Sequence, residues 1–498
     1  MKLKLHTIFL LLLLFSLPAI AALFHPGFFQ SDDGEWMIIR FSAFHQALAD
    51  GQFPVRFLHR LNYGYGYPVA DFLYPGFMYL GEILKLLGFG FVDTIKITLG
   101  ISLLESAIFS YFWLRSFFGK WSSLLGALFY LYTPYHLFDI YARGSVGETL
   151  SLALPPFVLW QIERKSLFWT SLGVALLILS HNTLAVLFLP IIAVYGFLRH
   201  TPYAIFFGLG LSAFFWIPAL YDLQYTVFNQ TKISKFGEYF SDINLIGLST
   251  IFVILSACAI VYRKRSTLSS YFLFICISSI FLATSLSHIF WEILPVSFVQ
   301  FPFRFLSIAI LSTSFLSAYI LDQFKEKNRI IIFITLLSLL GFSAIPYVKP
   351  KVTLDKGDLY YATNEATTTV QDEYMPVWVK QKPTEHFKNK VEILEGKGKI
   401  ENLVFNNKKI HFDVNMKNSG IVRVNTVYFP GWKAYVGGAE IEIDYSNKYG
   451  VMDISVVEDK STVKFIFSET PVRLFGDILS ISSFGMLLGF VFLRRRRL

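Results

Sequence analysis

Three carboxylates stand close together in the stretch SDDGEW, which follows an apolar N-terminal run: Asp32, Asp33 and Glu35. Adjacent carboxylates can ligate a divalent cation such as Mg²⁺ or Mn²⁺, and a carboxylate can accept the proton of an attacking hydroxyl. The residues from Trp36 to Ala49 have a helical pattern. An acidic residue before them can instead cap that helix and stabilise its positive N-terminal end. The sequence leaves these roles open.

Four arginines near the ends of apolar segments suit recognition of a phosphate group, because a guanidinium presents a planar fork of donors. They are Arg56, Arg60, Arg143 and Arg304. For each of them, snorkelling toward lipid headgroups is the alternative.

Three further residues are supporting candidates: His59, Glu148 and His181. Glu148 stands at the start of a helical segment. The alternative to a functional role is that its carboxylate only stabilises the positive end of that helix dipole. His181 follows an apolar segment in LSHNT, where a His-Asn pair can simply cap the next helix.

The composition predicts a protein that crosses a membrane many times. Hydrophobic residues make up 54% of the 498 residues, charged residues only 16%, and the mean hydropathy is +0.51. Soluble domains average about 25% charged residues. The formal net charge of +9 does not indicate nucleic-acid binding, because the lysines and arginines punctuate apolar segments and form no single basic face.

The N-terminal segment has a basic start and about 20 apolar residues, which favours a retained membrane anchor over a cleaved signal peptide. In either case Lys2 and Lys4 begin in the cytoplasm, so SDDGEW emerges on the outer side. Basic clusters then occupy every second gap between apolar segments, as expected for cytoplasmic loops.

This alternation predicts about twelve transmembrane helices with both termini in the cytoplasm, provided that residues 72–90 form an interfacial or re-entrant helix. The alternative is that residues 72–90 cross the membrane and that one of the later segments predicted to span it does not. The expected units are a transmembrane domain over 1–346 with a first outer loop at 25–91, an extracytoplasmic domain over 347–470, and a final helix with a basic tail over 471–498.

Residues 347–470 have a different pattern from the rest of the chain. Segments such as KIHFDVNM, IVRVNTVYF and STVKFIF alternate apolar and polar residues, and turn sequences such as NSG and GG separate them. Period-two alternation is typical of antiparallel strands. We expect an extracytoplasmic β-sandwich there.

Several motifs together resemble a known family: SDDGEW, ALADGQFPVRF, LNYGYGYP, YARGSVGE, LSHNT, QFPFRF, EYMPVWV and YFPGWKAY. They resemble the bacterial and archaeal membrane proteins labelled 6-pyruvoyl-tetrahydropterin synthase-related, which are similar to the YfhO-like branch of the GT-C glycosyltransferases. The resemblance covers nearly the whole chain. It implies transfer of a sugar from a polyprenyl-linked donor to an acceptor outside the cytoplasmic membrane, with Asp32 or Asp33 as general base or metal ligand.

One departure from the family pattern affects the site. Relatives often have His where this chain has Met37, two residues after Glu35. The expected function is a glycosyltransferase that acts on an envelope glycan, lipid or protein. The alternative is a non-enzymatic carrier of lipid-linked glycans, or an envelope-assembly protein, with the same fold. A carrier would favour charged residues deep within spans, whereas most ionisable residues of this chain stand at span ends.

Overall fold

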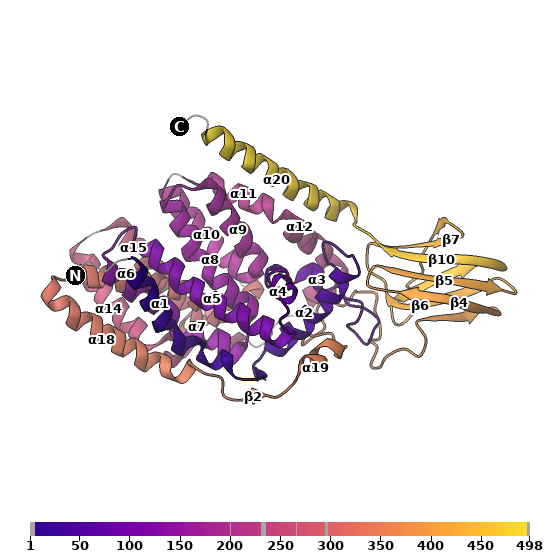
Figure 1. Ribbon diagram of the computed structural model, residues 1–498, viewed down its shortest axis with the longest axis horizontal. Helices are drawn as coiled ribbons and strands as arrows, with labels where there is room; N and C mark the ends of the chain where they lie inside the picture. Colours follow the sequence, from indigo (N-terminus) through magenta and orange to yellow (C-terminus); the bar gives the residue numbers. More distant parts are fainter. Residues whose placement is uncertain (1–4, 200, 231–235, 265, 294–296, 496–498) are drawn as a thin grey trace.

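The computed structural model describes residues 5–199, 201–230, 236–264, 266–293 and 297–495. An elongated body of helices carries a β domain at one end, and the last helix lies along the outside of the body (Figure 1). Both ends of the described chain lie away from the β domain (Figure 1). Lys2 and Lys4, on which the predicted orientation partly rests, lie outside the described residues.

The helical body contains fifteen helices of nine or more residues within the described ranges. They are α1 (Leu5–Ile20), α2 (Gly34–Ala49), α4 (Gly76–Leu86), α5 (Phe91–Leu114), α6 (Lys120–Tyr132), α8 (Val146–Glu163), α9 (Leu167–Ser180), α10 (Asn182–Leu198), α11 (Tyr203–Leu211), α12 (Ala213–Asp222), α14 (Leu248–Arg263), α15 (Thr267–Ala283), α17 (Leu306–Asp322), α18 (Glu326–Ala344) and α20 (Pro471–Arg495). Shorter helices include α3 (Val69–Phe72), α7 (Pro134–Phe138), η2 (Asp139–Arg143), α13 (Ile243–Ile246), α16 (His288–Ile293) and α19 (Asp358–Thr363).

Among the described residues, five helices are long and apolar enough to cross a membrane, and two bent helix pairs raise this number to as many as seven. The bent pairs turn by 69° after Leu211 and by 82° after Ala283. Other predicted spans are shorter than the ~20 residues that a bilayer core requires; α9 has 14 residues and α14 has 16. These helices indicate a membrane protein. The predicted number of twelve spans is not confirmed.

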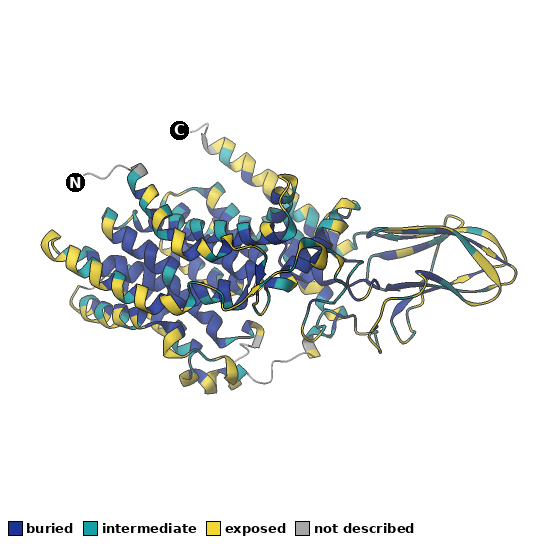
Figure 2. Cartoon of the chain, turned by 60° about the horizontal axis from the view of Figure 1, so that its bottom comes forward, coloured by how far each residue is buried: buried dark blue, intermediate teal, exposed yellow. Residues whose placement is uncertain are grey.

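The outer helices expose apolar side chains while the interior of the body is closely packed. In α20 the exposed residues include Ile478 and Ile481, and in α18 they include Ile331 and Ile334. Figure 2 shows yellow, exposed residues on the outer helices and a dark blue interior. Contiguous exposed apolar surface of this kind is expected to face lipid.

Residues 72–90 form no long helix. The chain turns through Leu73–Pro75 into α4, whose 11 residues are too few to cross a bilayer. The short helix fits the prediction that residues 72–90 do not cross the membrane fully, and its position at the interface stays a prediction.

The β domain consists of two antiparallel sheets. One has the order β4-β5-β10-β7-β8 and the other β3-β6-β9. The strands are β3 (Val391–Glu395), β4 (Gly398–Phe405), β5 (Lys409–Met416), β6 (Gly420–Val427), β7 (Trp432–Val436), β8 (Ala439–Ile441), β9 (Val451–Val456) and β10 (Asp459–Phe467). Alternate residues of β5 are buried, as the period-two pattern predicts.

Residues 347–390 lie between the helical body and the first strand of the β domain, and we call them the connecting segment. They contain β2 (Thr353–Leu354), which pairs antiparallel with β1 (Phe28–Phe29), and the short helix α19. The predicted domain over 347–470 thus includes this segment, which belongs to neither sheet and packs against the first loop.

Candidate active site

The acidic stretch lies directly before α2 and is fixed to η2 by two backbone hydrogen bonds. The Asp32 amide donates to the carbonyl of Ala142 at 3.1 Å, and the Asp33 amide donates to the carbonyl of Arg143 at 2.7 Å. The sequence separates these two segments by about one hundred residues, and the fold makes them neighbours.

Gly144 allows this close approach. Its φ of 63° is left-handed, and a β-carbon at this position would lie 2.3 Å from Ser31 Oγ and 2.9 Å from the Gly34 backbone. Only glycine allows both the left-handed backbone and this close approach at low cost. This explains the first glycine of the motif YARGSVGE.

The carboxylate of Asp33 does not cap α2. Asp33 is the residue that precedes the helix, but its side chain accepts no hydrogen bond from the first turn; Ser31 Oγ accepts one from the Gly34 amide at 3.3 Å. The Asp33 carboxylate instead pairs with Arg143 Nη2 at 3.1 Å. The side chain of Asp33 therefore does not have the helix-capping role that the sequence offers as an alternative.

Asp32 is the exposed member of the pair. Its side chain has no hydrogen bond or ion pair with any described residue, and both of its neighbours, Ser31 and Asp33, are more buried. Partial burial raises the pKa of the Asp32 carboxyl; Arg143 opposes this effect and Asp33 adds to it. A free carboxylate with a raised pKa has the properties of a general base.

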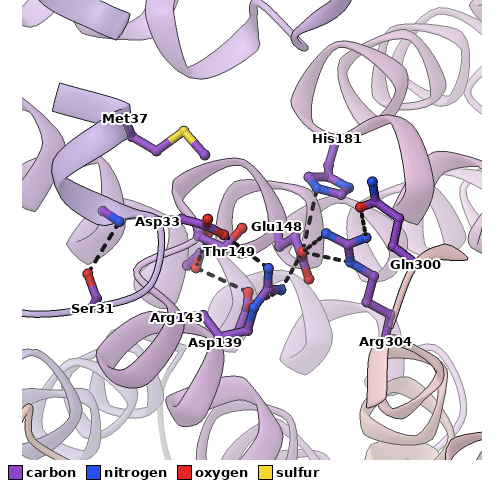
Figure 3. A network of polar contacts seen from close by, with 12 residues as sticks. Ser31, Asp33, Met37, Asp139, Arg143, Glu148, Thr149, His181, Gln300 and Arg304 are labelled. Carbon is purple, nitrogen blue, oxygen red and sulfur yellow. Dashed lines mark hydrogen bonds and ion pairs between the residues drawn. The ribbon is translucent and has the colours of Figure 1, made fainter. Parts of the chain in front are cut away.

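A buried network around Glu148 lies next to this pair (Figure 3). Arg304 donates to Glu148 Oε1 from Nε at 2.9 Å and from Nη2 at 2.8 Å, and Arg143 Nη1 donates to the same oxygen. Tyr135 donates its hydroxyl to Glu148 Oε2 at 3.3 Å. Glu148 is fully buried, so the two guanidinium groups compensate its charge.

Asp139 completes the network on the side of η2. Its carboxylate lies 3.2 Å from Arg143 Nη1 and accepts a hydrogen bond from Thr149 at 3.5 Å. Arg143 therefore contacts three carboxylates, those of Asp33, Asp139 and Glu148. Arg143 links the first loop rigidly to the buried network.

Arg304 is held on its other side by the turn before α17. Its Nη1 donates to the carbonyl of Val299 at 2.9 Å and to the side chain of Gln300 at 2.7 Å. The ring of Phe301 lies 4.8 Å from the guanidinium carbon. The four contacts from Nε, Nη1 and Nη2 fix the plane of the guanidinium.

His181 joins the network and also caps a helix. Its Nδ1 accepts a hydrogen bond from the Leu184 amide at 3.2 Å, and its Nε2 lies 3.6 Å from Glu148 Oε1. Because Nδ1 is an acceptor, the proton of the neutral ring is on Nε2, facing the carboxylate. The ring also packs against Tyr74, with centroids 4.5 Å apart. The capping role that the sequence offers is therefore present, and the functional role of His181 stays a prediction.

Glu35 is paired with the connecting segment. Its Oε1 lies 2.8 Å from Lys356 Nζ and accepts a hydrogen bond from the Tyr361 hydroxyl at 3.2 Å. Glu35 thus differs from Asp32, because its carboxylate already has partners.

Arg60 also contacts the connecting segment and lies away from the Glu148 network. Its guanidinium donates to the carbonyls of Asn364 at 3.1 Å and Ile39 at 3.1 Å, and to that of Ala362. Burial lowers the pKa of Arg60 to about 10, and Glu365 opposes this shift. The predicted phosphate-binding role of Arg60 would compete with these bonds.

Arg56 lies in a second buried network, where the β domain meets the helical body. It is within 3.4 Å of Asp71, 3.5 Å of Glu469 and 3.4 Å of Asp477. Arg473, at the start of α20, pairs with Asp71 at 3.4 Å and with Asp222 at 2.9 Å. We call these residues the junction network. The structure does not bring Arg56 together with Arg143 and Arg304.

His59 is buried close to the β domain. The amide of His59 donates to Asn407 at 3.0 Å, whereas neither ring nitrogen has a hydrogen-bond partner among the described residues. Burial lowers the pKa of His59 well below its ordinary value, and Lys390 lowers it further. A neutral His59 away from Asp32 has no contact with the candidate base.

Sequence reasoning missed four residues of this region: Arg40, Tyr135, Asp139 and Gln300. Asp139 is four residues before Arg143, and Gln300 is four before Arg304, which is the spacing of neighbours on a helix. Arg40 follows Asp33 by two turns of α2 and lies on the same face as Met37. The four-residue spacings could have indicated Asp139 and Gln300 as partners of the two arginines. The turn at Gln300 and the π-helical turn η2, however, are not evident from the sequence pattern.

The predicted Mg²⁺ or Mn²⁺ has little support in the geometry. Within the ranges that the structure describes, no group of three or more His, Cys, Asp or Glu side chains is arranged to hold a metal ion. Of the two predicted ligands, Asp33 is paired with Arg143, which leaves only the Asp32 carboxylate free.

Comparison with solved structures identifies similar folds. The arabinofuranosyltransferase AftD from Mycobacteria matches with a TM-score of 0.50 and 13% identity, over 72% of this chain and 28% of that chain. The Archaeoglobus fulgidus oligosaccharyltransferase, in complex with Zn and sulfate, matches with a TM-score of 0.45 and 14% identity over 74% of this chain and 58% of that chain. This chain thus spans less than a third of the length of AftD.

The likeness to AftD shows a shared fold and no more, because the sequence identity is low. The coarse part of the predicted fold is confirmed: the chain is mostly helical, has apolar helices long enough to cross a membrane, and carries a β domain before its last helix, in a fold similar to that of AftD. No protein-family model and no curated protein matches the sequence. The more specific family name remains a prediction.

Proposed function

We propose that this protein is a membrane glycosyltransferase of the GT-C type, which moves a sugar from a polyprenyl-phosphate donor to an envelope glycan, lipid or protein. The observation that carries the proposal is the Asp32 carboxylate, exposed and without a partner among the described residues, beside an Asp33 that Arg143 holds in place. The fold shared with AftD and the motifs of the YfhO-like branch support the same assignment.

In the proposed reaction, Asp32 takes the proton of an acceptor hydroxyl as the oxygen attacks the anomeric carbon of the donor sugar. The new glycosidic C–O bond forms while the bond between the anomeric carbon and the phosphate oxygen breaks. The electron pair of that bond leaves with the polyprenyl phosphate, and the proton remains on Asp32. A single displacement of this kind inverts the anomeric centre.

The buried network gives Asp32 and the reacting atoms a fixed frame. Arg143 holds both the backbone and the carboxylate of Asp33, and Glu148 ties Arg143 to Arg304. Groups held before the reaction stabilise developing charge without the cost of reorganisation. We propose that Arg143 and Arg304 contribute positive potential near the leaving phosphate through this frame.

The proposed orientation places the first loop and the β domain on the outer side of the cytoplasmic membrane, with both termini in the cytoplasm. The basic clusters of the sequence and the common position of both chain ends away from the β domain support it (Figure 1).

The test is sugar transfer in membranes that contain this protein, with a panel of labelled polyprenyl-phosphate sugars. We expect one donor to be used, and transfer to be lost in the Asp32→Asn variant while the amount of folded protein is unchanged. If Asp32→Asn and Asp33→Asn both transfer sugar at the wild-type rate, the acidic pair does not supply the base. If no donor is consumed, the enzymatic function is wrong. The carrier or assembly function would then be the better hypothesis.

A further inference from the structure

Arg40 is a buried arginine without an anionic partner. Its side chain, in the middle of α2, is 8% exposed. Its Nε donates to Thr368 Oγ1 at 2.9 Å, its Nη2 donates to the Thr368 carbonyl, and its Nη1 lies 3.6 Å from the thioether of Met37. A thioether is a weak acceptor. No described carboxylate is paired with Arg40, and the residues outside the described ranges include no Asp or Glu.

The other deeply buried arginines of the membrane body differ in this respect. Arg56, Arg143, Arg304 and Arg473 each contact at least one carboxylate. An isolated cation in a low-dielectric environment is costly unless a counter-ion compensates it. Because the chain supplies none for Arg40, an anion from outside the chain is the natural partner.

The position of Arg40 connects it to the candidate base. Arg40 follows Asp33 by seven residues on one helix, which corresponds to about 10 Å along the axis. Tyr74 and Tyr374 both lie within the electrostatic influence of Arg40 and of Arg304, and Tyr74 also within that of Asp33. Arg40 therefore lies on the helix that Asp33 precedes, two turns from the acidic stretch.

We propose that Arg40 binds the phosphate group of the lipid-linked donor, on the helix that Asp32 and Asp33 precede. This inference rests on the proposed function and adds the residue that receives the anion. Arg40 suits this role better than Arg56 and Arg60, whose guanidinium groups already have several partners. Met37 contributes no charge next to Arg40, which leaves the cation free for the substrate.

The competing explanation is structural: Arg40 only ties the connecting segment to α2 through Thr368. Two variants separate the explanations. Thr368→Val removes one hydrogen bond of Arg40 but leaves its charge. Met37→Glu supplies a carboxylate three residues before Arg40, which would neutralise it within the helix. A structural tether predicts that the first variant resembles Arg40→Gln and that the second is harmless.

The experiment measures binding of farnesyl phosphate to the purified full chain in phosphatidylcholine nanodiscs, together with thermal unfolding of each variant. We expect Arg40→Gln and Met37→Glu to weaken binding about 10- to 100-fold. Arg40→Lys should lose less, and Thr368→Val should remain within about 2-fold of the wild type. We also expect Met37→Glu to unfold at the same or a higher temperature, because it compensates a buried cation.

Two further probes distinguish the source of the phosphate. Inorganic phosphate should bind more weakly than farnesyl phosphate, and phosphatidylglycerol in the nanodisc should not displace farnesyl phosphate. Equal binding of inorganic phosphate, or displacement by phosphatidylglycerol, would overturn the assignment to a lipid-linked donor. Unchanged farnesyl phosphate binding in folded Arg40→Gln or Met37→Glu would overturn the role of Arg40 itself.

The binding assay needs no turnover, so its failure can be distinguished from failure of the proposed function. If farnesyl phosphate binding depends on Arg40 but no donor sugar is ever transferred, the enzymatic function alone is wrong. If transfer depends on Asp32 but farnesyl phosphate binding does not depend on Arg40, Arg40 does not bind the donor phosphate and the enzymatic function stands.

Discussion

The Glu148 network and the junction network have similar chemistry and different surroundings. Each buries two arginines among several carboxylates: Arg143 and Arg304 in the first, Arg56 and Arg473 in the second. The Glu148 network adjoins the exposed Asp32 through Asp33. The junction network lies where the first loop, α12, α20 and the end of β10 meet, and it joins the β domain to the helical body.

The comparison teaches that burial of paired charges does not by itself identify an active site. Breaking a buried pair by removing one partner is costly wherever it lies, because the remaining charge is uncompensated. What distinguishes the Glu148 network is its position next to a free, accessible carboxylate, because Arg143 holds Asp33 and Asp33 adjoins Asp32. Removing a charged partner should therefore lower the stability of the protein in either network, whereas we expect an effect on catalysis only from the Glu148 network.

The largest expected effect on catalysis comes from a residue that belongs to neither network. Asp32→Asn should lower sugar transfer about 10²- to 10⁴-fold, the range typical of general-base removal. The free energy of unfolding should hardly change, because the Asp32 side chain is exposed and unpaired. The measurement is the initial rate of transfer beside a thermal unfolding curve. Asp355→Asn, at an exposed residue of the connecting segment, is the matched control and should keep full activity.

Glu148→Gln should affect both stability and transfer. It removes the charge that Arg143 and Arg304 share, and we expect a loss of about 3–5 kcal/mol in the free energy of unfolding. Transfer by the folded fraction should fall by up to about 10²-fold, since displacement of Arg143 moves the first loop. Rates normalised to folded protein, measured below the unfolding transition, check this expectation. An unchanged normalised rate would remove the Glu148 network from catalysis.

Asp71→Asn is the corresponding change in the junction network. Asp71 lies between Arg56 and Arg473, but three other carboxylates remain near them, so the expected loss of stability is smaller, about 1–3 kcal/mol. Normalised transfer should stay close to the wild-type rate. Limited proteolysis should cut more readily between β10 and α20. A large loss of normalised transfer would show that the junction network also affects the active site. The two networks would then not differ in their effect on catalysis.

The sequence predicts the elements whose pattern is local. The strands of the β domain follow from alternation, and the GG turn is a tight one, with φ of 58° at Gly437 and 92° at Gly438. The number of spans cannot be read in the same way. Short apolar helices such as α9 pack inside the body and do not need the length of a bilayer, so apolarity alone does not distinguish them from spans.

The candidate site was predictable in its residue types but not in its pairings. Glu148 and Arg304 are 156 positions apart, and no periodicity relates them. Arg56 and Arg60 stand in the same loop and have the same chemistry as Arg143, yet the fold directs them to the β domain and to the connecting segment. Long-range packing decides which guanidinium meets which carboxylate, and a single sequence does not contain that information.

A smaller effect concerns the pH dependence. Burial and Asp33 raise the pKa of Asp32, so activity should fall as the pH drops through a value above the ordinary ~3.9 of Asp. Asp33→Asn should shift this acid limb to lower pH, because it removes the neighbouring negative charge and frees Arg143. Profiles of kcat/KM against pH measure the shift.

The sign of the linkage separates this loss from acid unfolding. A carboxyl whose pKa is raised in the folded state stabilises that state below its unfolded pKa, and the contribution disappears as the pH rises through the folded pKa. Asp32 therefore does not cause unfolding in acid. If the acid limb shifts upward in Asp33→Asn, or if it coincides with unfolding, Asp32 is not the titrating base.

The smallest effect is expected for Glu35→Gln, and it tests the third predicted catalytic carboxylate. Glu35 pairs with Lys356 in a partly exposed position, where such ion pairs contribute about 0–1 kcal/mol. Its oxygen is engaged by Lys356 and by the Tyr361 hydroxyl, so it is a poor proton acceptor compared with Asp32. We expect transfer within about 2-fold of the wild type and a small decrease in stability, which Lys356→Met should reproduce. A loss as large as that of Asp32→Asn would instead show that the connecting segment releases Glu35 when substrate binds, and that the base is shared between the two ends of SDDGE.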